Sequence, residues 1–417
     1  MSATLTNPPP IQGHVAPGFE PVREAFAQAF TRHGETGAAC TVIHQGRTVV
    51  QLRGGTTDVA QTQPWRPDTM LLVYSLTKGM TGLAAALAVS RGLFRYEQRV
   101  AEVWPEFAAN GKQDVTIRQL LSEQAGMAAM DLKLNLGNMG DQNTLAAALA
   151  RQAPNWTPGD WAGNHAYTIG WLASELIRRT DPRRRTLGRF FADEIAAPLG
   201  ADFHIGLPPS VPQQRIARIQ GFAAWRMLFA MDTLPPLMVL GMFWPWCLTF
   251  RTLNNPLLLQ GPAALDTPAW WPIENGGAGG IGSATGLATV YHEFATGGRK
   301  LGLAPEVLQA LSDAPPTPRN GWRDQVLKTS LVYSLGLEKP SPWLQFGSTP
   351  AAFGTFAVGG SFAFGDPATG LGYAYVTRKL GLYKWDDPRE KPVRDAVMAC
   401  VARLPQACTT PEMETVE

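Results

Sequence analysis

The chain contains few cysteines and little net charge. Its four cysteines, Cys40, Cys247, Cys400 and Cys408, show no metal-ligand spacing, because seven residues that include Pro405 separate even the closest pair. We interpret them as reduced thiols of a cytoplasmic protein and expect no metal or cofactor. Lys plus Arg number 36 and Asp plus Glu 34, so no strong field of either sign favours binding to nucleic acid.

Signal-peptide features and an uninterrupted apolar span are also lacking. Residues 1–10 have neither a basic start nor an apolar run. Residues 233–250 carry no charge, but three of them are prolines, and a helix broken that often would leave backbone groups unsatisfied in lipid. We therefore predict a globular protein without a stable membrane span.

Common nucleophile motifs are missing as well. No Gly-x-Ser-x-Gly elbow occurs, and the six histidines show no spacing typical of a metal pair. What the chain does contain is Ser75-Leu-Thr-Lys78 at the start of a helical pattern. Serine and lysine three residues apart on a helix share one face, where the amine can take the hydroxyl proton. A purely structural alternative is that Ser75 caps the helix and Lys78 is a surface cation.

Apolar periodicity divides the chain into helices and strands. The helix after Ser75 is apolar around most of its circumference, so we expect it to be buried at the centre of the fold. The pattern predicts helices over 19–33, 81–91, 117–121, 145–152, 167–179, 187–197, 283–296 and 388–404. It predicts strands over 40–43, 48–52, 330–338, 352–364, broken around Gly359 and Gly360, and 371–377.

Strands near both termini and helices between them predict an α+β fold. We expect one antiparallel sheet built from both chain ends, flanked by helices, with a mainly helical lobe inserted. In this interpretation residues 1–417 form a single catalytic domain. Its sheet lobe comprises 1–70 plus 283–417, its helical lobe comprises 71–282, and the active site lies between them.

Several longer stretches resemble one known family. Together they are similar to the serine β-lactamase superfamily, and within it to the class C β-lactamase-like carboxylesterases, the family VIII esterases. The similar stretches are Tyr74-Ser-Leu-Thr-Lys-Gly-Met80, 103–112, 115–122 with 125–126, Thr157-Pro-Gly159, 165–172, 198–202, Gly359-Gly-Ser361 and Gly365-Asp-Pro367.

The resemblance implies a β-lactamase/transpeptidase-like fold and an acyl-enzyme mechanism. Ser75 would attack an ester or amide carbonyl, and Lys78, its pKa lowered by burial, would accept the hydroxyl proton. The oxyanion would rest on the backbone amides of Ser75 and of a residue near Val358, beside Gly359. This combination implies a serine ester hydrolase or an acyltransferase.

The sequence departs from the family pattern at three positions. Asn164 stands where the family has a proton-transferring tyrosine, and no Tyr-x-Asn occurs in the chain. Glu123 follows Leu-Leu-Ser where a histidine is usual, and Thr355-Phe-Ala replaces the His-x-Gly or Lys-Thr-Gly box. Tyr167, one helical turn beyond Asn164, either supplies the missing phenol or packs in the core. Recognition of a carboxylate of the β-lactam type is not expected.

An aromatic segment, residues 225–250, falls where the family carries variable walls over the cleft. It is either a packed hydrophobic flap or the wall of an acyl-binding pocket, and the two interpretations are compatible. The substrate expected is therefore a small, largely apolar ester or thioester. The alternative, raised by the three departures, is a catalytically degenerate or repurposed protein with a binding, accessory or non-hydrolytic biosynthetic role.

Overall fold

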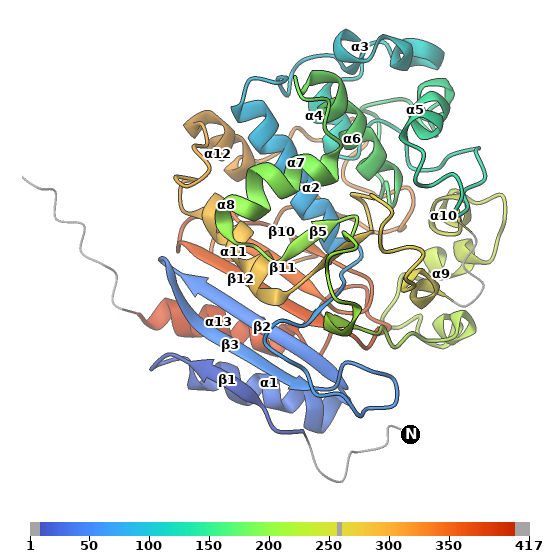
Figure 1. Ribbon diagram of the computed structural model, residues 1–417. Helices are drawn as coiled ribbons and strands as arrows, with labels where there is room; N and C mark the ends of the chain where they lie inside the picture. Colours follow the sequence, from blue (N-terminus) through green and yellow to red (C-terminus); the bar gives the residue numbers. More distant parts are fainter. Residues whose placement is uncertain (1–8, 257–260, 405–417) are drawn as a thin grey trace, which may run out of the picture.

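The computed structural model describes residues 9–256 and 261–404. Its centre is an antiparallel sheet of eight strands in the order β1-β3-β2-β12-β11-β10-β9-β8 (Figure 1). The strands are β1 Gln12–Val15, β2 Gly37–His44, β3 Arg47–Gly55, β8 Tyr333–Ser334, β9 Leu337–Glu338, β10 Phe353–Phe356, β11 Phe362–Asp366 and β12 Leu371–Thr377. Since β12 pairs with β2, the two chain ends meet in mid-sheet, which confirms the predicted α+β fold.

Helices cover both faces of this sheet. The terminal helices α1 (Glu20–His33) and α13 (Lys391–Arg403) pack against each other on one face, and α11 (Ala284–Ala295) packs on β2, β11 and β12 from the other. All seven residues of β12 are buried as a result. Ser283 caps α11 by accepting a hydrogen bond from the amide of Gly286 at 3.0 Å, as its position in the sequence suggests.

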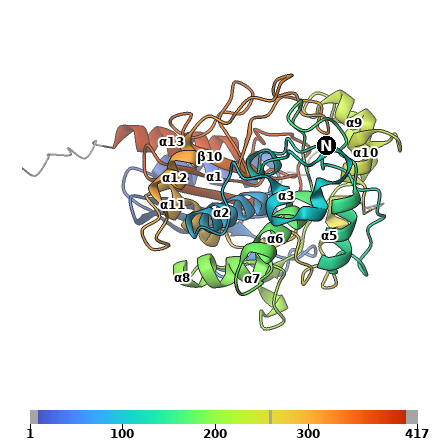
Figure 2. The same cartoon turned by 90° about the horizontal axis from the view of Figure 1, so that it is seen from above.

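A mainly helical lobe lies above the sheet in Figure 1. It contains α3 Val100–Val103, α4 Ile117–Leu121, α5 Gln142–Arg151, α6 Thr168–Thr180, α7 Leu187–Phe191 and α8 Ala197–Leu199. Helix α2 (Leu76–Ser90) runs between this lobe and the sheet and contacts α6, α7, β9 and β10, as the view from above in Figure 2 also shows. The prediction that this helix is buried is confirmed, because Leu76 to Ala88 are all buried.

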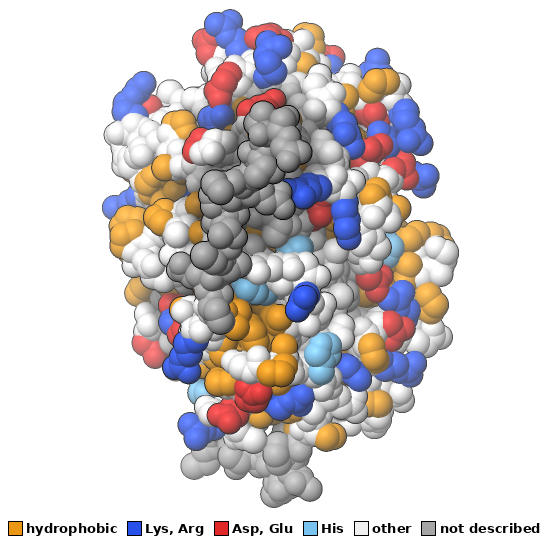
Figure 3. All heavy atoms as spheres, turned by 90° about the vertical axis from the view of Figure 1, so that its left-hand side faces the viewer, with side chains coloured by type: hydrophobic (Ala, Val, Ile, Leu, Met, Phe, Trp, Pro, Cys, Tyr) orange, Lys and Arg blue, Asp and Glu red, His pale blue; other side chains and the backbone are white. Residues whose placement is uncertain are grey.

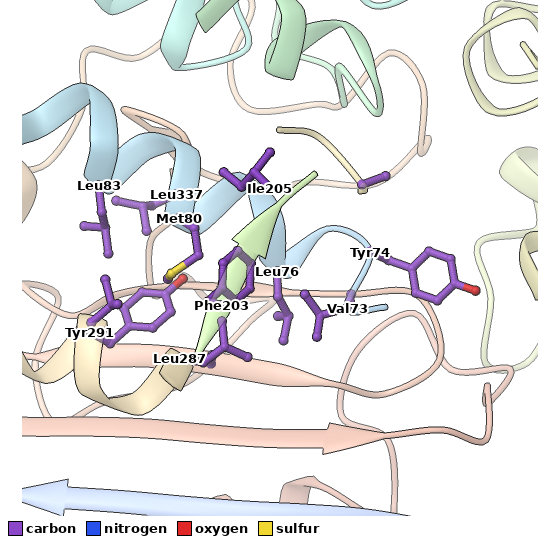
Figure 4. Close-up of a cluster of buried hydrophobic side chains, with 14 of the residues drawn as sticks. Val73, Tyr74, Leu76, Met80, Leu83, Phe203, Ile205, Leu287, Tyr291 and Leu337 are labelled. Carbon is purple, nitrogen blue, oxygen red and sulfur yellow. The ribbon is translucent and has the colours of Figure 1, made fainter. Parts of the chain in front are cut away.

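The first turns of α2 are anchored by an apolar cluster. Figure 4 shows Leu76, Met80 and Leu83 on the side of α2 that faces Leu287 and Tyr291 of α11, whereas the ring of Tyr74 points away from this cluster. The residue before the catalytic candidate Ser75 therefore projects in another direction than the residues after it.

Close packing of α2 against the sheet depends on Gly79. A methyl group at this position would lie 2.0 Å from the hydroxyl of Tyr291 and 2.7 Å from the hydroxyl of Thr355, both buried. We expect Gly79→Ala to lower the free energy of unfolding by roughly 1–3 kcal/mol, the usual cost of overpacking. Urea titration measures this, with Gly140→Ala as the control, since no atom lies within 4 Å of that position. Equal stability of the two variants would contradict the prediction.

Two features of the fold differ from the sequence prediction. A small second sheet, in the order β5-β7-β4-β6, comprises β4 Met70–Leu72, β5 Phe203–Ile205, β6 Ile216–Ala217 and β7 Gly280–Gly282. Strands of two or three residues are too short to show periodicity. The predicted continuous strand over 330–338 is wrong: Leu335 and Gly336, both at positive φ, turn the chain so that β8 pairs with β9.

The aromatic segment forms a flap at one edge of the molecule, shown in yellow-green at the right of Figure 1. It contains a 3-10 helix over Ala224–Phe229, α9 (Pro236–Met242) and α10 (Leu248–Leu253). Within the described residues, no helix combines the length and the hydropathy that crossing a bilayer requires. Cys40, Cys247 and Cys400 are free thiols, and Cys408 lies outside the described residues.

Candidate active site

A largely apolar cavity of about 200 Å³ opens between α2, the flap and the segment after β12. Ser75, at the start of α2, lies in its wall together with Asn164, Tyr167 and Val358. The apolar lining includes Phe222 and, from the flap, Met227, Leu234, Met238, Met242 and Leu253. A concave, mostly apolar site with a few polar groups is typical of a small-molecule pocket.

Ser75 does not cap its helix. It occupies the N-cap position with φ −62° and ψ −13°, and its side chain makes no capping hydrogen bond. The preceding Tyr74 has φ 48°, a left-handed conformation that is rare for a bulky residue and marks a strained elbow. The carbonyl of Tyr74 accepts from the hydroxyl of Thr77 at 2.5 Å, which in turn accepts from the amide of Gly280 at 2.8 Å. The elbow thus fixes the backbone before Ser75, which lines the cavity.

Two backbone amides at the cavity are available for an oxyanion. Neither the amide of Ser75 nor that of Val358 donates to another group of the described chain. The turn carrying Val358 is fixed by the amide of Ala357, which donates to the carbonyl of Ser361 at 2.9 Å, and by Arg389, which donates to the carbonyl of Gly359 at 2.6 Å. A fixed pair of free donors is the arrangement that stabilises a tetrahedral intermediate.

Lys78 lies beneath the cavity in a buried ion pair. Its Nζ donates to Oε1 of Glu123 at 2.7 Å and also to Oδ1 of Asn164. The other oxygen of Glu123 accepts from the amide of His165 at 3.0 Å. Glu123 itself has φ 57°, so a second strained residue contacts the Ser-x-x-Lys motif through Lys78. The acidic departure from the family pattern is thus the counter-ion of the lysine.

Asn164 is positioned by a residue that the sequence did not single out. Its amide donates to Oδ2 of Asp324 at 3.0 Å, and the same carboxylate accepts from the hydroxyl of Tyr333 at 2.5 Å. Oδ1 of Asp324 accepts from the amides of Val326 and Leu327, both at 2.6 Å. Burial raises the pKa of Asp324. No sequence motif marks this aspartate, because it stands in an irregular loop.

His165 and Tyr167 are poor candidates for proton transfer. Nε2 of His165 accepts from the amide of Met127 at 2.9 Å, so Nδ1 carries the proton and donates to the carbonyl of Gly163 at 2.6 Å. Burial lowers the pKa of His165 to about 3, which keeps the ring neutral. The phenol of Tyr167 lines the cavity, but burial raises its pKa and disfavours the phenolate that a base would need.

The remaining predicted site residues lie outside the cavity wall. Thr355 is fully buried in β10, where its hydroxyl accepts from Tyr291 at 3.1 Å. Gly359 follows Val358 in the turn but does not line the cavity, and Lys78 and Glu123 are buried and do not line it either. The structure therefore brings Ser75, Asn164, Tyr167 and Val358 to one surface.

Lys384 is the cavity residue that sequence reasoning missed. It lies between β12 and α13, lines the same wall as Ser75, and places its Nζ 4.5 Å from the centre of the Phe356 ring. Only its aromatic neighbours Tyr383 and Trp385 distinguish it in the sequence, and they form no pattern typical of a site.

Comparison with known proteins identifies the class. The profile of the Beta-lactamase family matches residues 22–397, and the chain therefore belongs to the beta-lactamase family. This confirms the family predicted from the motifs.

Its relatives include esterases. Esterase/beta-lactamase LipL of Mycobacterium tuberculosis is 32% identical over 379 residues, which are 88% of this chain and 83% of LipL. The crystal structure of a family VIII carboxylesterase is 33% identical with a TM-score of 0.82, and the match covers 94% of this chain and all of that one. EstA from Arthrobacter nitroguajacolicus Rue61a is 30% identical with a TM-score of 0.79, covering 93% and 98% of the two chains. The fold and the esterase branch of the family agree with the sequence prediction.

Proposed function

We propose that this protein is a serine ester hydrolase that forms an acyl-enzyme through Ser75. The observation that carries the proposal is the strained elbow at Tyr74, which presents an uncapped serine hydroxyl to an apolar cavity beside two free backbone amides. The esterase relatives support the same reaction class. Three departures from the family pattern do not remove the nucleophile or the oxyanion donors.

The reaction has two balanced steps. Oγ of Ser75 bonds to the ester carbonyl carbon as its proton passes to a base, and the oxyanion is held by the amides of Ser75 and Val358. The carbon–oxygen bond to the leaving group then breaks, and that oxygen takes the proton. Water repeats the sequence on the acyl-enzyme and releases the acid. The Lys78 cation adds positive charge below the site, with Asn164 and Glu123 fixing its position.

The cavity lining favours a small, largely apolar acyl group. Four methionine and leucine side chains from the flap, those of Met227, Leu234, Met238 and Met242, face the space in front of Ser75. Burying the methylene groups of an acyl chain against these side chains lowers the free energy of binding, and the four side chains offer no hydrogen-bond partner to a polar chain. An ester or thioester with a short alkyl chain fits these surroundings.

Narrowing the cavity should change the preferred chain length. Met238→Trp is expected to lower kcat/KM for an octanoate ester roughly tenfold or more while sparing the acetate ester, because the indole occupies space that the longer chain needs. The matched control is Leu237→Trp, since Leu237 is the exposed neighbour on the opposite side of α9. A p-nitrophenyl ester series measures both variants. Parallel losses on acetate and octanoate would exclude Met238 from the acyl site.

Covalent labelling tests the proposed reaction itself. Incubation with a fluorophosphonate probe should add one probe mass to the intact protein, and peptide mapping should place it on Ser75. A p-nitrophenyl butyrate assay on the same preparation should show turnover. Absence of both the adduct and turnover would favour the alternative of a catalytically degenerate binding protein.

Acyl transfer is the second candidate activity. The apolar flap limits water at the acyl-enzyme and thereby favours attack by another alcohol. Adding a short alcohol during turnover should then yield a transester at the expense of the acid, which gas chromatography quantifies. If the ratio of transester to acid equalled that of the uncatalysed reaction, acyl transfer would be excluded and hydrolysis would remain as the proposed activity.

A further inference from the structure

The proposed mechanism lacks an evident proton acceptor for Ser75. The Ser75 hydroxyl makes no hydrogen bond to another described residue, and Nζ of Lys78 donates to Glu123 and Asn164 and not to Ser75. Asn164 has no basic atom that could replace the family's tyrosine. A serine hydroxyl is a weak nucleophile without a base, so the acceptor must come from elsewhere in the cavity wall.

Lys384 is the remaining amine in that wall. Its Nζ contacts the aromatic ring of Phe356 and forms neither an ion pair nor a hydrogen bond with the described part of the chain. Its backbone is fixed nonetheless, because the amide of Lys384 donates to the carbonyl of Thr233 at 3.2 Å, and the hydroxyl of Thr233 donates to the carbonyl of Leu382 at 2.5 Å. The amine is thus held at the cavity by a rigid segment, with its protons uncommitted.

The charges around Lys384 permit a neutral amine near physiological pH. Burial is the main cause that lowers the pKa of Lys384 to about 8, and the Lys78 cation acts in the same direction. Asp324, Glu338 and Glu123 oppose this shift. Their effect is reduced because Glu123 is paired with Lys78 and because burial raises the pKa of Glu338 to about 8.

We propose that Lys384 is the general base and acid of this site, in place of the missing tyrosine. This inference rests on the proposed function. The neutral amine takes the Ser75 proton, directly or through one water, as Oγ bonds to the carbonyl carbon. The ammonium then protonates the departing alkoxide. During deacylation the amine accepts a proton from the attacking water, and it returns that proton to Oγ of Ser75 as the bond between Oγ and the acyl carbon breaks. Electrons and protons balance without any further reactant.

Lys384→Met tests this role through the leaving group. We expect kcat/KM for a neutral ethyl ester to fall by about 10²–10⁴-fold, whereas the loss for the p-nitrophenyl ester is smaller, because nitrophenolate departs without protonation. The rise of kcat/KM with pH near 8 should disappear in the variant. Lys384→Arg should also fail, since a guanidinium stays protonated, and added methylamine should restore part of the Lys384→Met rate.

Lys379→Met is the matched control. Lys379 lies on the same segment, but its Nζ donates to the carbonyl of Gly34, away from the cavity. Its variant should keep both rates and the pH profile. If Lys384→Met also kept both ester rates and the pH profile, or if Lys384→Arg were fully active, the role of Lys384 would be refuted. The proposal that Ser75 is the nucleophile would not be affected. If the wild-type protein neither turned over esters nor labelled on Ser75, both proposals would fall together.

A second, independent observation concerns the outer surface of the flap. Large apolar side chains gather there, and Phe229 and Trp246 are each 80% exposed. The other exposed members are Trp225, Leu228, Leu237, Leu240, Phe243 and Trp244. Since Met238 and Met242 of the same segment line the cavity, the flap is apolar on both faces. On the opposite side of the molecule, Figure 3 shows basic and acidic side chains interspersed with apolar patches.

The charges beside this outer surface are mainly basic. Arg323 and Lys328 border a shallow groove with Trp244 and Trp246, and Arg226 is exposed among the flap aromatics. No ion pair of the described residues involves these three cations, and Asp232 is the exposed acid of the flap. Arg251 of the flap, by contrast, pairs with Asp131 at 2.8 Å. Tryptophan and phenylalanine beside unpaired basic side chains are typical of a surface that lies at an anionic lipid interface.

We infer that the outer face of the flap docks on an anionic lipid surface, which would bring the cavity mouth next to apolar esters. The full-length protein should co-sediment with phosphatidylglycerol/phosphatidylcholine vesicles at low salt, less with phosphatidylcholine alone, and less again at high salt. Phe229→Ser combined with Trp246→Ser should reduce binding at least tenfold. Trp343→Ser, which removes an exposed tryptophan outside the flap, should not.

Three results would refute this docking surface. They are absence of vesicle binding at low salt, equal loss in the Trp343→Ser control, and a stable dimer in light scattering that the flap double variant abolishes. The last result would assign the surface to a second copy of the chain. Because Ser75→Ala protein can be used throughout, the outcome does not depend on catalysis.

Discussion

Ser75→Ala should abolish ester turnover while leaving the fold as stable as the wild type. We expect kcat/KM to fall by at least ~10⁴-fold, as when other serine hydrolases lose their nucleophile. Stability should be unchanged within about 0.5 kcal/mol, because the hydroxyl makes no capping hydrogen bond whose loss would destabilise α2. Stopped assays with p-nitrophenyl butyrate and urea titrations measure the two quantities on one preparation.

The control for this result is Ser283→Ala. Ser283 does cap its helix, through the amide of Gly286 at 3.0 Å, so its loss should cost about 1 kcal/mol of stability and leave turnover intact. The two serines should therefore show opposite effects. Retained turnover or fluorophosphonate labelling in Ser75→Ala would assign the nucleophile to another residue.

Lys78→Met should cost both activity and stability. The Lys78–Glu123 pair is buried, with side chains that are 3% and 2% exposed, so the variant leaves the Glu123 carboxylate without its counter-ion. Breaking such a pair from one side typically costs about 3–5 kcal/mol of stability. We also expect kcat/KM to fall at least ~10²-fold, because Asn164 loses the ammonium that orders it below Ser75.

A double variant separates these two effects. Lys78→Met with Glu123→Gln removes both charges, so most of the lost stability should return, while turnover stays low. Urea titration and the ester assay again give the two readouts. Recovery of turnover together with stability would show that Lys78 acts only as a structural cation, and an additive loss of stability would show that the pair is not coupled.

Some features of the site and the fold can be predicted from local residue patterns alone. Ser75 and Lys78 were predicted as a catalytic pair because their spacing places them on one face at the start of a helix, and because the motif precedes an apolar repeat. The helix over 117–121 and the strand over 371–377 were predicted with their observed bounds for the same reason: each is a local pattern of burial. Glu123 was recognised only as a departure from the family pattern. Its role as the ion-pair partner of Lys78 was not predicted, since the two residues are 45 positions apart in the chain.

Lys384 and Asp324 could not be predicted from local sequence patterns. Neither belongs to a motif, and each reaches the site through a loop whose path depends on packing with distant segments, such as the contact between Lys384 and Thr233. The role of Lys78 as proton acceptor stays a prediction, and the ion pair that the structure gives it with Glu123 could not be read from the sequence. Proximity to a charge partner, more than burial alone, determines what a lysine can do.

The sequence by itself determined the family and the sheet from both chain ends, and it singled out Ser75 as the proposed nucleophile, because these inferences depend on periodicity and short spacing. Only the tertiary structure decided that Ser75 is uncapped, that Glu123 neutralises Lys78 and that Lys384 enters the cavity. Such contacts join residues far apart in the chain, and their free energies depend on distance and burial that exist only after the chain has folded.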